Sequence, residues 1–116
     1  MLPASERLRS NSEFQQVYQE GRSFPEGVVV LYLLRVPDLT VRQAGFSVSK
    51  KLGNAVMRNV VKRRLREAYR QHLPALPHGY RAIFVARRSA AEADFGKVER
   101  SMKRALEKAG LLADMV

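Results

Sequence analysis

Apolar residues near the start of the chain recur with a helical period. Phe14, Val17 and Tyr18 stand at positions i, i+3 and i+4, which places them on one face of a helix. This pattern predicts a helix over residues 13–20. A short strand at residues 22–24 is expected to follow before the next turn.

Three further runs have the composition of strands. Residues 27–36 are rich in Val, Leu and Tyr, which is typical of a strand buried on both sides. Residues 41–49 alternate, with Ala44, Phe46 and Val48 on one side and polar residues on the other. We expect these two runs to form an antiparallel pair. A third strand is predicted at residues 80–86.

Two longer helices are predicted in the second half of the chain. One runs from residue 55 to about residue 71 and ends before Pro74. The other carries apolar residues at helical spacing from Val98 to Ala109.

Polar residues at the expected positions cap all three helices. Ser12, with Gln15 three residues later, has the spacing of a capping box for the first helix. Asn54 and Asp94 are favourable N-caps for the second and third helices. Gly110 suits the position that follows a helix.

These elements predict one domain over residues 1–116, with residues 1–10 as a mobile basic leader. The order α-β-β-β-α-β-α defines an α+β class with a two-layer α/β sandwich. A helical connection between the strands at 41–49 and 80–86 can make them parallel, and such crossovers are normally right-handed. The absence of cysteine suits a reducing, cytoplasmic location, and the longest apolar run, 28–34, is too short to span a bilayer.

Charge distinguishes this chain from an ordinary domain of its size. It carries 21 lysines and arginines against 11 acidic residues, a formal net charge of +10. Such an excess attracts polyanions, so nucleic acid, an anionic membrane surface and an acidic protein are the candidate partners. A basic surface that serves only solubility is the alternative.

The cations concentrate in residues 50–70, which hold eight of them against one acid, Glu67. A helical projection separates a basic row and its neighbours from an apolar arc. The row is Arg58, Lys62, Arg66 and Arg70, the neighbours are Asn59 and Arg63, and the apolar arc is Met57, Val61, Leu65 and Ala68. We expect the apolar side to pack on a sheet and the basic side to bind a polyanion. A solvated face is the alternative, although such a face normally mixes Glu with Lys.

Two other features favour nucleic acid. Lys50 and Lys51 precede a glycine and Asn54 at a helix start, where free backbone N–H groups suit a phosphate. Four aromatic residues also lie upstream of the basic helix, and rings beside cations are typical of sites for single-stranded nucleic acid. They are Phe14, Tyr18, Tyr32 and Phe46. Core packing is the alternative for these rings, above all for Phe14 and Phe46, because tyrosine hydroxyls favour partial exposure.

Candidate catalytic groups are few. Asp38, Asp94 and Asp114 have no metal-ligand spacing, and His72 and His78 have no carboxylate neighbour in the sequence to orient them. No glycine loop of the nucleotide-binding type is present. The sequence therefore indicates no metal site and no active site carried by the protein itself.

One long segment resembles a known family. Residues 45–59, GFSVSKKLGNAVMRN, with the KR at 62–63 and LRE at 65–67, are similar to the signature of the bacterial ribonuclease P protein component. The RL at 7–8, the first helix and the AR at 86–87 extend the resemblance over nearly the whole chain.

The resemblance implies a fold and a function. The fold is a small sandwich, shared with a ribosomal protein domain, whose strand–helix–strand crossover is left-handed. The partner is a large catalytic RNA, and together they remove the 5′ leader of precursor tRNA. Magnesium, the cofactor, is held mainly by the RNA subunit. The protein binds this RNA and the single-stranded leader, and it aids magnesium and substrate affinity.

The resemblance also implies two sets of site residues. The RNA-binding set is Lys50, Lys51, Asn54, Arg58, Asn59, Lys62, Arg63, Arg66 and Arg70. The substrate-leader cleft is Phe14, Tyr18, Tyr32, Phe46 and Lys51. The chain departs from the family pattern at Val60, where an arginine is usual, so one contact is absent or is supplied by Arg63 or Arg64.

Two other functions remain open from the residues alone. A non-catalytic RNA-binding protein of the ribosomal type explains the charge and the fold equally well. A membrane-active amphipathic helix is the weaker reading, because the apolar arc of the basic helix is needed for the core and contains no Trp or Phe.

Overall fold

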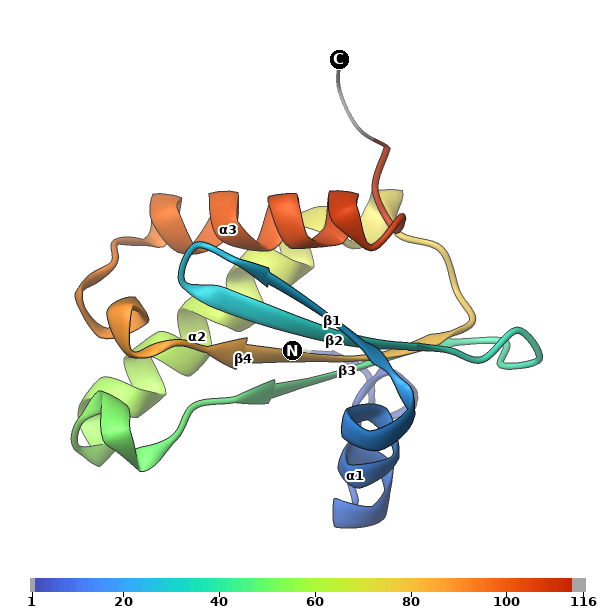
Figure 1. Cartoon of the computed structure of the whole chain (residues 1–116), viewed down its shortest axis with the longest axis horizontal. Coiled ribbons are helices and arrows are strands. Elements are labelled where there is room, and N and C mark those ends of the chain that lie inside the picture. The colour runs from blue at the N-terminus through green and yellow to red at the C-terminus, as the bar shows by residue number, and fades with distance from the viewer. Residues whose placement is uncertain (1, 114–116) are drawn as a thin grey trace.

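A computed structural model describes residues 2–113 of the chain (Figure 1). The elements follow the predicted α-β-β-β-α-β-α order. They are α1 (Asn11–Glu20), β1 (Arg22–Glu26), β2 (Val29–Arg35), β3 (Arg42–Ser47), α2 (Ala55–His72), β4 (Tyr80–Ala86) and α3 (Phe95–Lys108). Short 3-10 turns lie at Ala4–Glu6, Lys50–Leu52, Leu73–Ala75 and Arg88–Glu92. The four strands form one mixed sheet with α2 and α3 on one face and α1 on the other.

The strands stand in the order β1-β2-β4-β3. The expected antiparallel pairing of β2 with β3 is therefore wrong, because β4 lies between them. β4 pairs antiparallel with β2 and parallel with β3. The central position of β2 and β4 explains why both are so apolar, since each has a neighbour on both sides, one face buried beneath the long helices and the other face partly covered by α1.

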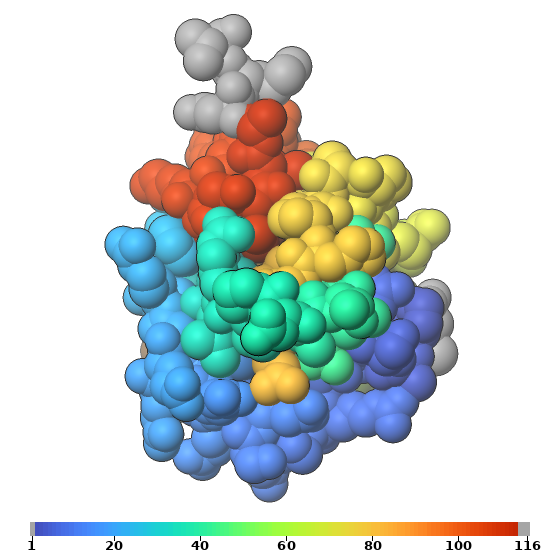
Figure 2. All heavy atoms as spheres, turned by 90° about the vertical axis from the view of Figure 1, so that its right-hand side faces the viewer, coloured from blue at the N-terminus to red at the C-terminus, as the bar shows by residue number. Residues whose placement is uncertain are grey.

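The connection from β3 through α2 to β4 is a left-handed crossover. Figure 2 looks along the strands from the β2–β3 loop, with the end of α2 and α3 above the sheet, α1 below it and β1 on the left. In this view β3 lies to the right of β4, and both strands point away from the viewer. The chain thus passes from β3 on the right to β4 on the left through α2, which lies on the upper face of the sheet. This connection is left-handed, whereas such connections are commonly right-handed.

The start of α1 differs from the prediction by two residues. Ser10, not Ser12, is the N-cap, and Glu13, not Gln15, completes the capping box. The Glu13 carboxylate accepts hydrogen bonds from the N–H groups of Ser10 and Arg9 at 3.0 and 2.9 Å, and these bonds lower its pKa. Two overlapping serine spacings compete in the sequence, and the ionised side chain makes the stronger reciprocal bonds.

The N-terminal segment packs on the sheet, which differs from the mobile leader that the sequence predicts. Leu8 is buried, and its N–H donates to the Ala44 carbonyl of β3 at 3.1 Å. Glu6 forms an ion pair with Arg42 at 2.9 Å. Arg42 in turn donates to two carbonyls after α2. This segment therefore covers the first part of the free edge of β3.

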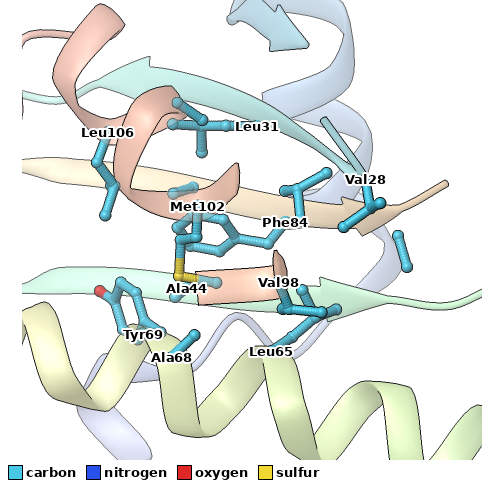
Figure 3. Packing of buried hydrophobic residues seen from close by; sticks show 14 of the residues in the cluster. Val28, Leu31, Ala44, Leu65, Ala68, Tyr69, Phe84, Val98, Met102 and Leu106 are labelled. Carbon is cyan, nitrogen blue, oxygen red and sulfur yellow. The ribbon is translucent and has the colours of Figure 1, made fainter. Parts of the chain in front are cut away.

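The main core lies between the sheet and the two long helices (Figure 3). Phe84 of β4 and Leu31 of β2 pack against Met102 of α3 and Leu65 of α2, and all four are buried. The hydroxyl groups of Tyr69 and Tyr80 form a hydrogen bond at 2.7 Å, and burial raises the pKa of both phenols. No helix within residues 2–113 combines the length and the apolar character needed to cross a membrane.

Candidate nucleic-acid interface

The basic helix α2 is held in a fixed orientation by its cap and its apolar arc. The Asn54 side chain accepts a hydrogen bond from the Met57 N–H at 2.9 Å, which confirms the predicted N-cap. Val61, Leu65 and Ala68 are fully buried against the sheet and α3. The opposite arc of α2 therefore faces outward along the whole helix.

The structure places most of the predicted RNA-binding residues on this outer surface. The exposed members are Lys50, Lys51, Asn54, Asn59, Arg63, Arg66 and Arg70. Arg58 and Lys62 are partly buried instead. Residues spaced four apart do not stay on one line along a helix. Four residues exceed one helical turn, so each step rotates the row by about 40° around the helix axis. The exposed row thus runs from Asn59 through Arg63 and Arg66 to Arg70, with Arg58 and Lys62 at its edge.

The outer face of α2 is poorly neutralised. Within the described chain, residues 50–70 make one ion pair, from Arg70 to Glu67 at 2.7 Å, and it is exposed. This contact lowers the pKa of Glu67 and raises that of Arg70. Arg64, which the sequence places beside the apolar arc, donates to the Ala93 carbonyl at 2.8 Å. Arg63 and Arg66 make no hydrogen bond or ion pair with any residue in 2–113, so both guanidinium groups face solvent.

Met57, which the sequence places in the buried apolar arc of α2, is exposed in the structure. Its exposed fraction is 37%, and that of the adjacent Val56 is 73%. The first turn of α2 lies beyond the end of β3, so no strand covers it (Figure 1). Helical periodicity gives the direction of a side chain, but it does not show where the sheet beneath the helix ends.

The predicted cleft residues divide between the two faces of the sheet. Phe14 packs so closely on β3 that a Cβ on Gly45 would lie 2.4 Å from its ring. Tyr18 and Tyr32 meet edge to face with ring centroids 4.9 Å apart, on the same face. Partial burial raises the pKa of the Tyr18 phenol.

Phe46 is a correction to this set, because its ring points to the opposite face. It stacks on Phe84 at 5.7 Å and meets Tyr69 at 5.8 Å, in the main core. Ala44 and Phe46 do share one side of β3, as the alternation predicts, and Val48, just after the strand, packs on the same core. That side is the one covered by α2 and α3. Lys51 lies outside the sheet, in the exposed turn before α2.

The face that holds Phe14, Tyr18 and Tyr32 is partly open. α1 packs on this face, and Arg81 near the start of β4 donates to its Gln16 side chain at 2.9 Å. Farther from α1 along the sheet, Val30 of β2 lies opposite Val85 of β4, and both remain partly exposed. The open part of the sheet therefore lies between α1 and the turn before α2.

Two cations near this face were missed in the sequence. Arg81 also donates to Gln43 at 2.9 Å, so its guanidinium is fixed on the α1 side of the sheet. Arg7 lines a surface hollow with Phe14, Lys62 and Arg66. Alternation along β4 places Arg81 on the side of the strand that faces away from the main core. This pattern could have identified Arg81 from the sequence. No local signal placed Arg7 beside α2.

Metal-ligating groups do not gather in the described part of the chain. No three side chains of the His, Cys, Asp and Glu types come together within residues 2–113 in a way that could hold a metal ion. His72 pairs with a single carboxylate, that of Glu99 at 2.9 Å. These residues do not form a site for the magnesium ion that the family resemblance implies.

A strongly basic helix face beside a partly open aromatic sheet defines a small nucleic-acid-binding protein of the α+β class. The sequence profile of the Ribonuclease P family matches residues 2–110. The chain belongs to this family. It is therefore a protein subunit of ribonuclease P, the ribonucleoprotein endonuclease that processes the 5′ end of precursor tRNA.

Individual relatives agree with the profile. The ribonuclease P protein component of Natranaerobius thermophilus is 42% identical over 105 residues, which is 90% of each chain. That of Clostridium botulinum strain Alaska E43 is 39% identical over 114 residues, covering 93% of this chain and 91% of the relative. The Staphylococcus aureus RNase P protein structure matches with a TM-score of 0.84 and 32% identity, over 92% of this chain and 97% of that one.

The family decides among the functions that the residues left open. It favours the ribonuclease P subunit over a ribosomal-type RNA-binding protein. The structure also disfavours the membrane-active hypothesis, because Val61, Leu65 and Ala68, three of the four residues of the apolar arc, are buried in the core.

Proposed function

We propose that this chain binds the catalytic RNA of ribonuclease P through the outer face of α2 and supplies no catalytic group of its own. The observation that carries this proposal is the row of exposed cations on α2, in which Arg63 and Arg66 have no carboxylate partner among residues 2–113 and Arg70 alone pairs with an acid, Glu67. Guanidinium groups bind phosphates in a bidentate manner, and their attraction to RNA needs no compensating rearrangement inside the protein. Arg63 also lies one turn after Val60, so it can supply the cation that the family motif has at that position, whereas Arg64 is engaged by Ala93.

The single-stranded 5′ leader is assigned to the open sheet face beside α1. Tyr18 and Tyr32 offer ring surfaces there, and single-stranded RNA is bound by rings on which its bases stack. Phe14 forms the floor next to Gly45. The exposed Lys51, in the turn that leads into α2, suits the leader phosphates.

Magnesium belongs to the RNA subunit in this proposal. The described carboxylates are scattered, and the face of α2 is positive, so the protein would repel a bare cation at that surface. The chain instead reduces repulsion between RNA segments, which aids their binding of magnesium and substrate. A cytoplasmic location accords with this role in tRNA maturation.

Reconstitution tests the division of labour. The purified protein alone should leave precursor tRNA intact, because its described His, Asp and Glu side chains form no cluster that could hold a metal ion to activate water. The protein added to catalytic RNA at low magnesium should restore removal of the leader. Cleavage by the protein alone, unaffected by removal of the RNA, would contradict the proposal.

The one acid on the basic face gives a second test. Glu67→Gln should tighten binding of the catalytic RNA by about threefold at low salt, because it frees Arg70 and removes a negative charge from the face. The gain should vanish at high salt. Filter binding over a salt series measures it, with Glu92→Gln, an exposed acid of the turn before α3, as the control. An equal gain from the control would assign the effect to net charge alone.

A further inference from the structure

The outer face of α2 begins with an apolar residue, although most of that face is polar or charged. Val56 has an exposed fraction of 73%, the highest among the large hydrophobic residues of the described chain. Residues three and seven positions later lie on the same side of a helix, so Val56 shares its arc with Asn59 and Arg63. A side chain this exposed adds almost nothing to folding stability, which leaves its methyl groups available to a partner.

Val56 does not stand alone. Val60, one turn further along α2, is partly exposed and lies at the i+4 position, where side chains on a helix meet. The two valines form a small apolar surface that has cations before and after it along the chain. Lys50 and Lys51 precede it in the turn before the helix, and Arg63 follows it.

We propose that Val56 and Val60 make a non-polar contact with the catalytic RNA, against the face of a ribose or an unstacked base. In a nucleic-acid chain the sugar and base lie between successive phosphates. A surface that holds phosphates on both sides of the valines therefore brings a sugar or base onto them. This contact rests on the proposed function of α2 and specifies what that surface recognises besides phosphate.

The position of the valines favours the catalytic RNA over the leader and over a second protein copy. They lie on the outer arc of α2, whereas Tyr18 and Tyr32 lie on the opposite side of the sheet, beneath α1. Two small side chains bury far less area than a stable dimer needs. The surrounding cations would also repel the same face of a second copy.

A non-polar contact has a distinct salt signature. Phosphate contacts release counterions, so their contribution to the binding free energy weakens as the salt concentration rises. Burial of methyl groups contributes about the same binding free energy at each salt concentration. Val56→Thr keeps the shape of the side chain but replaces a methyl group with a hydroxyl. We expect it to weaken binding of catalytic RNA by roughly fivefold at every salt concentration, with an unchanged slope of log K against log salt.

Matched variants separate this contact from others. Arg63→Gln should flatten the salt slope by about one unit, as expected for a phosphate contact. Val36→Thr, a partly exposed valine in the β2–β3 loop at the far end of the sheet, should change neither the affinity nor the slope (Figure 1). Thermal unfolding of Val56→Thr should match that of the unchanged protein, because the side chain is exposed.

Several results would overturn the inference. Unchanged affinity of Val56→Thr for catalytic RNA would do so, as would a flatter slope with no salt-independent loss. A reduced preference for precursor over mature tRNA, with normal affinity for catalytic RNA, would place Val56 on the substrate. A dimer that Val56→Thr abolishes would place it in a protein interface. Failure of the unchanged protein to bind catalytic RNA would instead overturn the proposed function itself.

Discussion

Replacing both Arg63 and Arg66 with glutamine should weaken binding of the catalytic RNA by about 100-fold at moderate salt. Both guanidinium groups are exposed and have no hydrogen-bond or ion-pair partner within the described part of the chain, so each is available for a phosphate. A hydrogen bond to a charged group contributes about 1.5–3 kcal/mol, and exposed groups fall at the low end of this range. Two losses of about 1.5 kcal/mol give an effect on the order of 100-fold. The slope of log K against log salt should flatten by about two units. Filter binding or fluorescence titration over a salt series measures both quantities.

A matched pair of charges on α3 controls for net charge. Arg100 and Arg104 are also exposed, and their replacement with glutamine removes the same two charges from another helix. We expect that control to change the affinity by less than about threefold, because exposed charges outside the contact surface are largely screened by salt. Equal losses from the two double variants would show that the total charge of the protein, and not the face of α2, binds the RNA.

Local features of this fold could be predicted from the sequence with little error. The limits of β4 and the caps at Asn54 and Asp94 agree with the structure. Gly110 has a φ of +79°, as expected for a residue that follows a helix in the left-handed region. Each of these features depends on residues within one turn of each other, so the information for it lies in a short segment.

Long-range features could not be predicted in the same way. The alternation in β3 places Ala44 and Phe46 on one side, but nothing local shows that β4 inserts between β2 and β3. The side on which α1 packs also depends on contacts between distant segments. The sequence therefore does not show that the Phe46 ring lies on the opposite face from Phe14, Tyr18 and Tyr32. The packing of Leu8 on β3 joins residues 36 positions apart, and a single leucine in a basic segment does not reveal it.

In the candidate site, too, the sequence predicts which way side chains point but not what surrounds them. The spacing of α2 correctly predicts a basic face opposite Val61, Leu65 and Ala68. It does not predict that Arg58 is partly buried, with an Nε atom that has no hydrogen-bond partner among residues 2–113. Because replacement of Arg58 would disturb packing as well as charge, Arg63 and Arg66 are the cleaner test of RNA binding.

Replacing Tyr18 with alanine should remove most of the preference of the holoenzyme for precursor tRNA over mature tRNA. A base that stacks on an aromatic ring contributes about 1–3 kcal/mol, so the affinity for precursor should fall by that amount while the affinity for mature tRNA is unchanged. The Tyr18 ring is 40% exposed and meets Tyr32 edge to face, so its removal also leaves Tyr32 without its neighbour. Tyr18→Phe should stay near the unchanged protein, because the ring and not the hydroxyl provides the stacking surface.

Phe46 provides the control that separates stacking from folding, because its ring lies on the opposite face of the same sheet. It packs on Phe84 and Tyr69, so Phe46→Leu should lower the free energy of unfolding by about 1 kcal/mol and leave the preference for precursor unchanged. Tyr18→Ala should do the reverse, with a large loss of preference and a small change in stability, since much of its ring is already in water. If Phe46→Leu lowered the preference for precursor at unchanged stability, the leader would contact the face covered by α2 and α3. The assignment of the leader to the face beside α1 would then be wrong.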